Sequence, residues 1–298
     1  MIKYEWRTAL AAAEAEQLAD LLRRAAEYDA EPEYNAIAFD DIERSLAVSD
    51  GHHKHLVIWM LPYGTTLGEK DQPERIAGII RLVTAAEGVA EATIVIDPRL
   101  RSIGITTLLL ERIGLDGNAA EGFWGTGFHT ITGWARGNHP AAGRLSNRFL
   151  IPRTRRIWKL IRSTDSVEDA TAAPVLEQLP GASTTDTLGW LTTSDSGEMM
   201  ALREEGRVVG AVHIDLDPAE SEEFGRCATL TTVSASPAAP KGARRRLLEG
   251  AAAIVHEAGL TGVIVHVDSD DAEWVNACRS VGFQHDRTDV RFQLGGLS

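Results

Sequence analysis

The stretch Ile94–Ile113, IVIDPRLRSIGITTLLLERI, decides how this chain is expected to fold. Its first three residues are β-branched and apolar and predict a strand, which Asp97 and Pro98 end because proline cannot donate a ladder hydrogen bond. A short turn that contains Gly104 follows, and leucines and isoleucines at helical spacing then predict a helix. A helix that starts directly after a strand is a ready anion site, since free backbone N–H groups and the helix dipole point the same way.

The spacing of this stretch resembles the pyrophosphate loop of the GCN5-related N-acetyltransferases. Their pattern is a strand, x-Pro, Arg/Gln-x-x-Gly-x-Gly/Ala, and a helix with paired leucines. Four features of that pattern are in register here: Pro98, Arg101, Gly104 and Leu108-Leu109. The departure is Thr106, where the family prefers glycine or alanine, because the threonine side chain crowds a close phosphate approach. An ordinary β-turn-α crossover is the alternative interpretation.

Composition limits the classes of protein to consider. The chain has 298 residues, of which 44% are hydrophobic and 24% charged, so it is globular and long enough for two domains. A net charge of −13 argues against nucleic acid as a partner. Cys227 and Cys278 have no disulfide framework or metal spacing, which fits a reducing compartment. Without a signal-peptide core or a membrane-spanning apolar run, we expect a cytoplasmic protein with no membrane partner.

The first half of the sequence has the element order of the acetyltransferase fold, β-α-α-β-β-β-α-β-α-β. Strands are expected at 2–7, 55–61, 75–84, 90–96, 130–135 and 155–162. Helices are expected at 11–27, within 31–46 together with a loop, after the turn at 101–106, and at 140–149. The resemblance is closer still to the mycothiol synthase family, a tandem of two such domains. YEWRTALAAAEAEQLADLL resembles that family's first strand and helix, and GWARGNHPAAGRL resembles its strand-to-helix corner.

The second half has a similar order of elements after a linker at 163–187. VHVDSDDAEWVNACRSVGF (Val265–Phe283) resembles the acetyltransferase strand, corner, helix and Gly-Phe, and a last strand is expected at 290–294. The opening strand and helices of this second copy are missing or irregular. We therefore expect an α/β (α+β) protein of two tandem domains, 1–162 and 163–298, each with a mixed central sheet flanked by helices and the second shortened.

The second domain's loop, SPAAPKGARRRLL, departs from the phosphate-binding pattern. Pro240 stands where Arg or Gln is expected, Gly242 comes one residue early, and Arg244 replaces the second small residue. A shortened loop with a bulky side chain is poorly shaped to wrap a pyrophosphate, so we predict a mostly structural second domain. In the alternative, Lys241 and Arg244–Arg246 bind phosphates by charge.

The resemblance implies acetyl-CoA as the cofactor, held by the first domain. In this family the strand before the loop gives backbone groups to the pantetheine and to the thioester carbonyl, and one N–H aimed at a developing oxyanion contributes roughly 3 kcal/mol. The implied cofactor-binding residues are Ile94, Val95, Ile96, Arg101, Ser102, Ile103, Gly104, Ile105, Thr106, Thr107 and, at the late corner, Asn138. The neighbouring His139 is interpreted as a capping residue of that corner.

The candidate catalytic residues are Glu91 and Ser146. An attacking amine must be neutral, so a base or a water chain is needed. Glu91 shares a strand face with Thr93 and Val95. If it is the base, burial between its apolar strand neighbours should raise its pKa; a solvent-facing glutamate at the strand end is the alternative. The family's usual acid, a tyrosine on the late helix, is replaced by Leu145, and Ser146 or water would substitute for it.

The resemblance thus implies an N-acetyltransferase, an acyltransferase that moves an acetyl group from acetyl-CoA to a small-molecule amine. Acidic residues in the segment that covers the acceptor side in this fold would attract a cationic amine: Glu31, Glu33, Asp40 and Asp41. A catalytically idle tandem that acts as a binding protein, and a mycothiol synthase-like enzyme, stay open as alternatives. No metal is expected, since His52, His53 and His55 have no carboxylate at ligand spacing.

Overall fold

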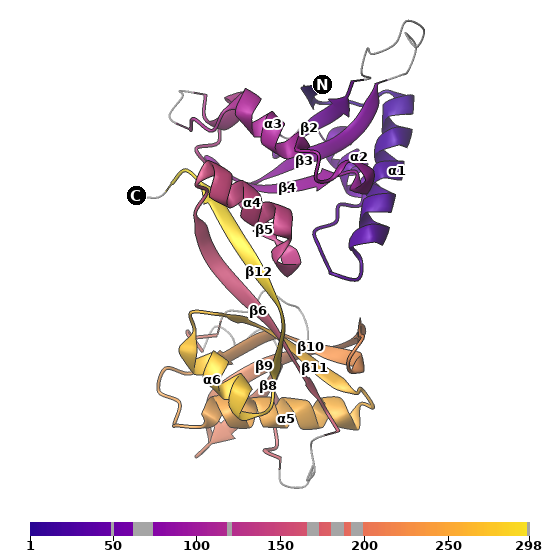
Figure 1. Ribbon diagram of the computed structural model, residues 1–298. Coiled ribbons are helices and arrows are strands. Elements are labelled where there is room, and N and C mark those ends of the chain that lie inside the picture. The colour runs from indigo at the N-terminus through magenta and orange to yellow at the C-terminus, as the bar shows by residue number, and fades with distance from the viewer. Residues whose placement is uncertain are drawn as a thin grey trace, which may run out of the picture. The chain divides into compact units, whose positions relative to one another are not determined.

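The computed structural model describes residues 1–48, 51–61, 74–117, 121–165, 173–179, 188–191 and 199–296 (Figure 1). The chain forms two compact units: unit 1 is Met1–Arg155 with Asp289–Ser298, and unit 2 is Arg156–Thr288. The predicted linker, 163–187, lies largely outside the described residues. The predicted domain boundary at residue 162 stays a prediction, while the division between the compact units falls after Arg155.

Unit 1 contains the elements of the first half in the predicted order. In chain order these are β1 (Ile2–Arg7), α1 (Ala12–Asp29), α2 (Phe39–Ala47), β2 (His53–Met60), β3 (Arg75–Ala86), β4 (Val89–Ile96), the 3-10 turn η1 (Pro98–Leu100), α3 (Ile105–Ile113), η2 (Phe123–Gly125), β5 (Thr130–Ala135), η3 (Arg136–Asn138) and α4 (Pro140–Phe149). The start of β6 (Arg153–Ser163) and the end of β12 (Gln284–Leu294) complete the unit.

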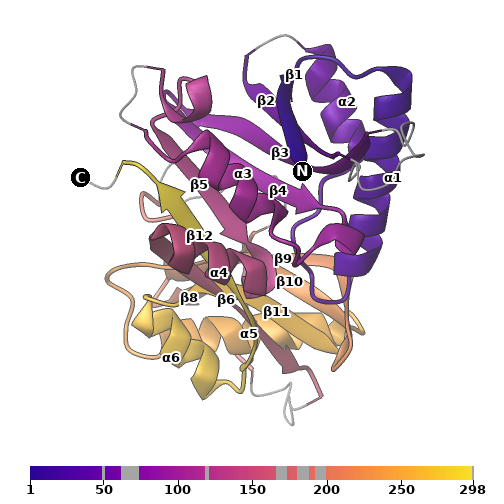
Figure 2. The same cartoon turned by 45° about the horizontal axis from the view of Figure 1, so that its top comes forward.

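The sheet of unit 1 is mixed and has helices on both faces (Figure 2). Strands β1 to β4 are antiparallel neighbours, β4 and β5 are parallel, and β5 pairs antiparallel with β12. Alternation along β2 decides which helix each side chain meets. Leu56 and Ile58 pack on the side of Leu109 in α3, whereas Val57 and Trp59 pack on the side of α1 and α2.

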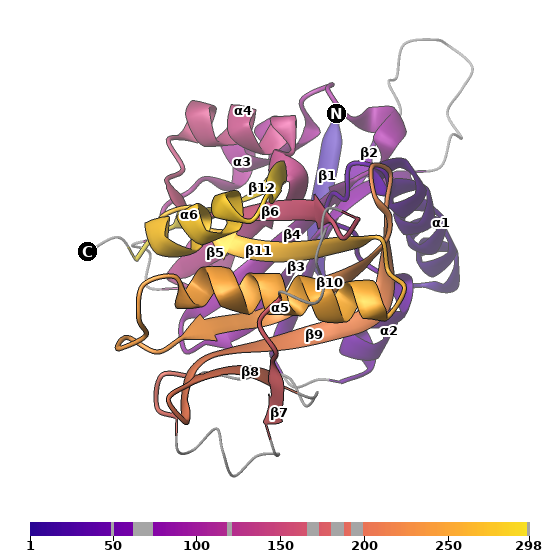
Figure 3. The same ribbon diagram turned by 90° about the horizontal axis from the view of Figure 1, so that it is seen from below.

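Unit 2 contains a sheet that carries a long helix. Its elements are β6 from Arg156 on, β7 (Glu177–Leu179), β8 (Met199–Glu204), β9 (Arg207–Ser221), β10 (Gly225–Ala235), α5 (Ala243–Glu257), β11 (Gly262–Asp268), α6 (Ala272–Ser280) and the start of β12. Figure 3 shows α5 lying along β9 to β11, where Leu247 and Leu248 are buried with Val212, Leu230 and Val263. Within the described part of 163–198, β7 is the only helix or strand besides the end of β6.

Two strands belong to both units, which the sequence did not predict. Strand β6 follows the elements of unit 1, but from Ile157 on it pairs with β11 of unit 2. Strand β12 follows the elements of unit 2, but its residues from Val290 to Leu294 pair with β5 of unit 1. Among the described residues, no helix combines the length and apolarity needed to cross a membrane.

Candidate functional site

The turn between β4 and α3 leaves backbone N–H groups open at the start of the helix. Asp97 accepts a hydrogen bond from the backbone N–H of Arg99 at 3.0 Å and so begins the η1 turn. Gly104 then precedes α3 with a left-handed backbone, φ 84°, and no side chain caps the helix. A Cβ at Gly104 would meet no atom within 4 Å. Uncapped N–H groups beside open space suit the oxygens of a phosphate.

The strand before this turn parts from its parallel neighbour. Pairing between β4 and β5 ends at Glu91↔Thr132, although β4 continues to Ile96 and β5 to Ala135. Backbone groups of β4 beyond Glu91 are therefore no longer bonded to β5 along that edge. A ligand can replace the missing strand partner in such a gap.

The predicted cofactor-binding residues lie on β4, in the turn after it, at the start of α3 and, for Asn138 alone, in η3 after β5. In β4, Ile94 is 38% exposed, Val95 is buried and Ile96 is half-buried. In the turn, Ser102 has a left-handed backbone (φ 69°) and Ile103 is 60% exposed.

The first turn of α3 continues the same set. Ile105 is buried and anchors the helix start in the core of unit 1. Thr106 and Thr107 are half-buried, and their N–H groups belong to the uncapped first turn.

Arg101 is held by α1. Its Nη1 and Nη2 atoms each lie 2.6 Å from one carboxylate oxygen of Asp29, and its Nε donates to the carbonyl oxygen of Ile96 at 3.1 Å. The ring of Tyr28 lies 5.3 Å from the guanidinium carbon. The side chain is thus committed to α1 and β4 in this conformation, so its contribution to a phosphate site would come through the backbone that it holds.

Glu91 lies at the last residue pair before β4 and β5 part. The expectation that it is buried is wrong, because its side chain is exposed and stays in water. Its apolar strand neighbours face the core on alternate positions and do not cover it. Its role as a base stays a prediction.

The corner after β5 is held by its own capping interactions. Asn138 is exposed and has a left-handed backbone (φ 52°). His139 caps α4, since its Nδ1 accepts from the Ala141 N–H at 3.1 Å. Its ring lies 4.3 Å from that of Tyr34, and burial lowers its pKa, as does the charge of Arg101.

Ser146 lies on the buried face of α4 and is 6% exposed. Its hydroxyl donates to the carbonyl oxygen of Ile151 at 2.8 Å, and its own carbonyl accepts from the Leu150 and Ile151 N–H groups. The hydroxyl thus closes the end of the helix in this conformation. Its role as an acid stays a prediction that this geometry does not support.

The corresponding turn of unit 2 ends in the same backbone conformation. Gly242 precedes α5 with φ 85°, without a side-chain cap, and a Cβ there would meet no atom within 4 Å. The arginines that follow each face a glutamate: Arg244 pairs with Glu273 at 2.5 Å, Arg245 with Glu249 at 2.8 Å and Arg246 with Glu204. These pairs compete with phosphate binding by charge alone.

Strands β10 and β11 of unit 2 also part. Their parallel pairing ends at Leu230↔Val265, and a cavity of about 380 Å³ lies beyond, lined in part by Thr232, Asp268 and Trp274. On α6, Cys278 is buried, and burial raises the pKa of its thiol to about 12. That thiol is a poor proton donor near neutral pH.

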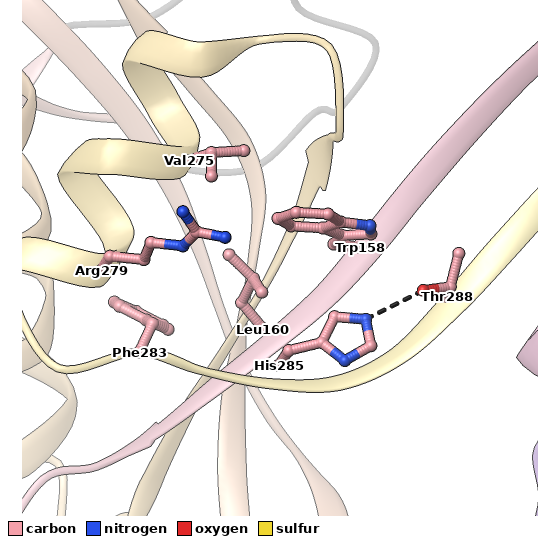
Figure 4. A pocket seen from close by; sticks show the side chains of 7 residues that line it. All are labelled: Trp158, Leu160, Val275, Arg279, Phe283, His285 and Thr288. Carbon is pink, nitrogen blue, oxygen red and sulfur yellow. Dashed lines mark hydrogen bonds between the residues drawn. The ribbon is translucent and has the colours of Figure 1, made fainter.

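A further cavity of about 330 Å³ lies against α6 in unit 2 (Figure 4). Trp158 and Phe283 supply aromatic walls, and the Arg279 guanidinium carbon lies 5.6 Å from the Trp158 ring. On the other side, His285 Nε2 and Thr288 Oγ1 are 2.9 Å apart. Sequence reasoning did not predict this cavity, because its walls come from β6, α6 and β12, which are far apart in the chain.

Sequence reasoning also missed Asp29 and Tyr34, which contact the predicted site from α1 and the segment after it. The helix was expected to end at Glu27, whereas α1 continues to Asp29. Asp29 continues the apolar face of Leu22 and Ala25 at helical spacing, and an acidic residue on that face is a signal that could have marked it. No local sequence pattern indicates that its partner is Arg101, which lies 72 positions away.

Comparison with known proteins shows the fold of this chain. No family model matches the chain. It is similar to a tandem GNAT protein from the clavulanic acid biosynthesis pathway, at TM-score 0.60 and 15% identity, with both chains fully covered. This chain is a tandem protein with the GCN5-related N-acetyltransferase fold. A GCN5-related N-acetyltransferase from Sphaerobacter thermophilus also shares the fold, at TM-score 0.59 and 16% identity over 97% of this chain and 95% of that one.

Sequence relatives of this tandem GNAT-fold chain are mycothiol acetyltransferases. That of Saccharomonospora viridis is 29% identical over 198 residues, covering 54% of this chain. The match spans 64% of that relative's length. That of Sanguibacter keddieii is 25% identical over 255 residues, which is 72% of this chain and 78% of the relative.

Proposed function

We propose that this protein is an acetyl-CoA-dependent N-acetyltransferase that acetylates a small-molecule amine and binds its cofactor in unit 1. The observation that carries the proposal is the uncapped start of α3 after Gly104, at the end of a strand that has parted from β5. Open space around Gly104 and a free strand edge fit a ligand with phosphates at one end and an amide-bearing arm.

In this proposal each part of the site has one task. Bound acetyl-CoA would supply an acetyl group activated as a thioester: a bond would form between the amine nitrogen and the acetyl carbon, the C–S bond would break, and coenzyme A would leave as the thiolate. The first N–H groups of α3 hold phosphate oxygens. Backbone N–H groups of β4 beyond Glu91, on the edge that no longer pairs with β5, would stabilise negative charge on the thioester carbonyl oxygen. Glu91, at the point where the strands part, accepts the proton that the amine loses.

Charge supports an amine as the acceptor. Glu31, Glu33 and Asp40 are exposed in the segment between α1 and α2 and at the start of α2, and the whole chain has a net charge of −13. An acidic rim raises the local concentration of a cationic ligand, an effect that salt screens. The names of the relatives make a mycothiol-type acceptor the second candidate.

A pair of matched variants tests the cofactor site. Gly104 and Gly242 have the same left-handed conformation and the same open surroundings, so Gly104→Glu and Gly242→Glu impose equal backbone strain and equal charge. We expect calorimetric coenzyme A affinity to be lost in Gly104→Glu and kept in Gly242→Glu.

Loss of affinity in Gly242→Glu but not in Gly104→Glu would indicate that the cofactor binds in unit 2. The parting of β10 and β11 and the cavity beside them favour that site. Release of free thiol from acetyl-CoA with a panel of amines tests the activity itself. Coenzyme A binding without thiol release from any amine would favour a catalytically idle binding protein.

A further inference from the structure

The turn that would hold the cofactor phosphates is tied to α1 at two points. Arg24 Nη2 lies 2.7 Å from Asp97 Oδ2 at the beginning of the turn. Arg101 and Asp29 form the two-point pair, at 2.6 Å for each contact, in its middle. Both ion pairs join residues more than 70 positions apart in the sequence, so they fix how α1 and the turn lie within unit 1.

Both ion pairs are largely buried, and the pair of Arg101 with Asp29 makes two contacts, so they restrict the relative positions of α1 and the turn. The side chains of Asp29 and Asp97 are 4% and 5% exposed, and those of Arg101 and Arg24 are 19% and 17% exposed. Two parallel N–H···O contacts fix the guanidinium plane as well as its position. Water screens a pair this sheltered far less than a surface pair.

Arg101 transmits this anchorage to the start of α3. Its Nε also donates to the Ile96 carbonyl, so one side chain joins α1 to the end of β4. The backbone then runs through left-handed conformations at Ser102 and Gly104 into the helix. Left-handed conformations allow only a narrow range of backbone dihedral angles. The position of Arg101 therefore determines the direction of the first N–H groups of α3.

Residues 29–35 also contact the corner after β5, on the other side of the gap between β4 and β5. The Asp29 carbonyl accepts from the Tyr34 N–H at 3.1 Å, and the Tyr34 ring packs on His139. Asn35 Oδ1 accepts from the Arg136 N–H at 2.9 Å. Residues 29–35 therefore contact both the turn after β4 and the corner after β5.

We propose that Asp29 is a positioning residue that orients the phosphate-binding turn through Arg101 and thereby sets the affinity for a pyrophosphate-bearing cofactor. The inference rests on the proposed function, since it presumes that coenzyme A binds at this turn. It adds a residue on α1 that does not touch the cofactor and acts through the Arg101 side chain.

The test compares Asp29→Asn with Glu27→Gln. Glu27 lies on the same helix in an exposed pair with Arg23, at 2.8 Å, and serves as the matched control. Coenzyme A affinity by calorimetry should fall about tenfold or more in Asp29→Asn, the loss typical when a partner that orients ligand-binding groups is removed, and should be unchanged in Glu27→Gln. KM for acetyl-CoA should rise by the same factor while kcat at saturation is kept, whereas a merely unstable variant would lose active protein and kcat.

A double variant keeps the test decisive if Asp29→Asn folds poorly. In Asp29→Asn/Arg101→Gln two neutral amides replace the pair, so no charge is left buried without a partner. If Asp29 acts through Arg101, the coenzyme A affinity of the double variant should equal that of Asp29→Asn and that of Arg101→Gln, because each variant removes the same anchorage. Wild-type affinity in Asp29→Asn, or losses in Asp29→Asn and Arg101→Gln that add up in the double variant, would overturn the role of Asp29. A wild-type protein that binds no coenzyme A would instead overturn the proposed function and this inference with it.

Discussion

His55 should make the stability of unit 1 depend on pH in a defined window. It lies in β2, is 3% exposed, and its Nε2 is 3.0 Å from Ser45 Oγ of α2. Burial, with a smaller effect of the neighbouring Arg81 charge, lowers its pKa from 6.5 to about 4. The folded state therefore keeps His55 neutral at a pH where the unfolded chain already binds a proton.

The sign and size of the effect follow from that difference. Above about pH 6.5 both states are neutral at this side chain, so it adds no pH dependence. As the pH falls from 6.5 to 4, only the unfolded state gains the proton, and the free energy of unfolding decreases. The gap between a pKa of 6.5 and one of about 4 corresponds to about 3 kcal/mol. That is a large part of the ~5–15 kcal/mol typical of a folded protein.

Urea denaturation of the wild type and of His55→Gln, at pH values from 8 to 4, measures this effect. Glutamine can keep a hydrogen bond to Ser45 and does not titrate, and the carboxylates that titrate in both proteins cancel in the difference. The wild type should lose about 3 kcal/mol relative to the variant between pH 6.5 and 4. A difference that stays flat over this range would refute the reasoning.

Four other substitutions or reagents have expected outcomes. Asp97→Ala removes an acceptor for one backbone and one guanidinium donor and should cost about 2–3 kcal/mol by chemical denaturation, with Asp97→Asn costing less. Gly78→Val would place its Cβ 2.6 Å from the Val95 carbonyl oxygen, so β4 must shift, and both the melting temperature and coenzyme A affinity should fall. The buried Cys278 thiol, with its pKa of about 12, should resist an aromatic disulfide reagent until the protein is unfolded; labelling of the native protein would contradict this burial. Glu91→Gln should lower turnover by roughly 10²-fold with unchanged coenzyme A affinity, and near-normal turnover would assign deprotonation to water.

The elements of unit 1 could be predicted because their signals are local. The bounds of β1, β5 and α4 agree with the prediction, the start of β4 differs by one residue, and α3 begins at Ile105, inside the turn that was expected to run to Thr106. Apolar periodicity, Pro98 and Gly104 act within a few residues of where they stand. The similarity to the acetyltransferase fold rested on these same local patterns.

What could not be predicted depends on partners distant in the sequence. Asp29 and Arg101 lie 72 positions apart, and no spacing rule joins a helix end to a loop at that distance. Whether Glu91 is covered depends on neighbouring elements, which a strand pattern does not report. The turn before α5 was expected to be misshapen, yet Gly242 reaches the same backbone conformation as Gly104 by a shorter path.

The exchange of β6 and β12 has a consequence for how the protein is made. A ribosome releases the chain from its N-terminus, and domains ordinarily fold in that order. Unit 1 cannot complete its sheet until Val290–Leu294 emerge, after all of unit 2 has been synthesised. Until then β5 presents an unpaired edge, which is a hazard for aggregation in a nascent chain. The first unit to begin is thus the last to be finished, and a gene cut between the units would leave the β5 edge bare.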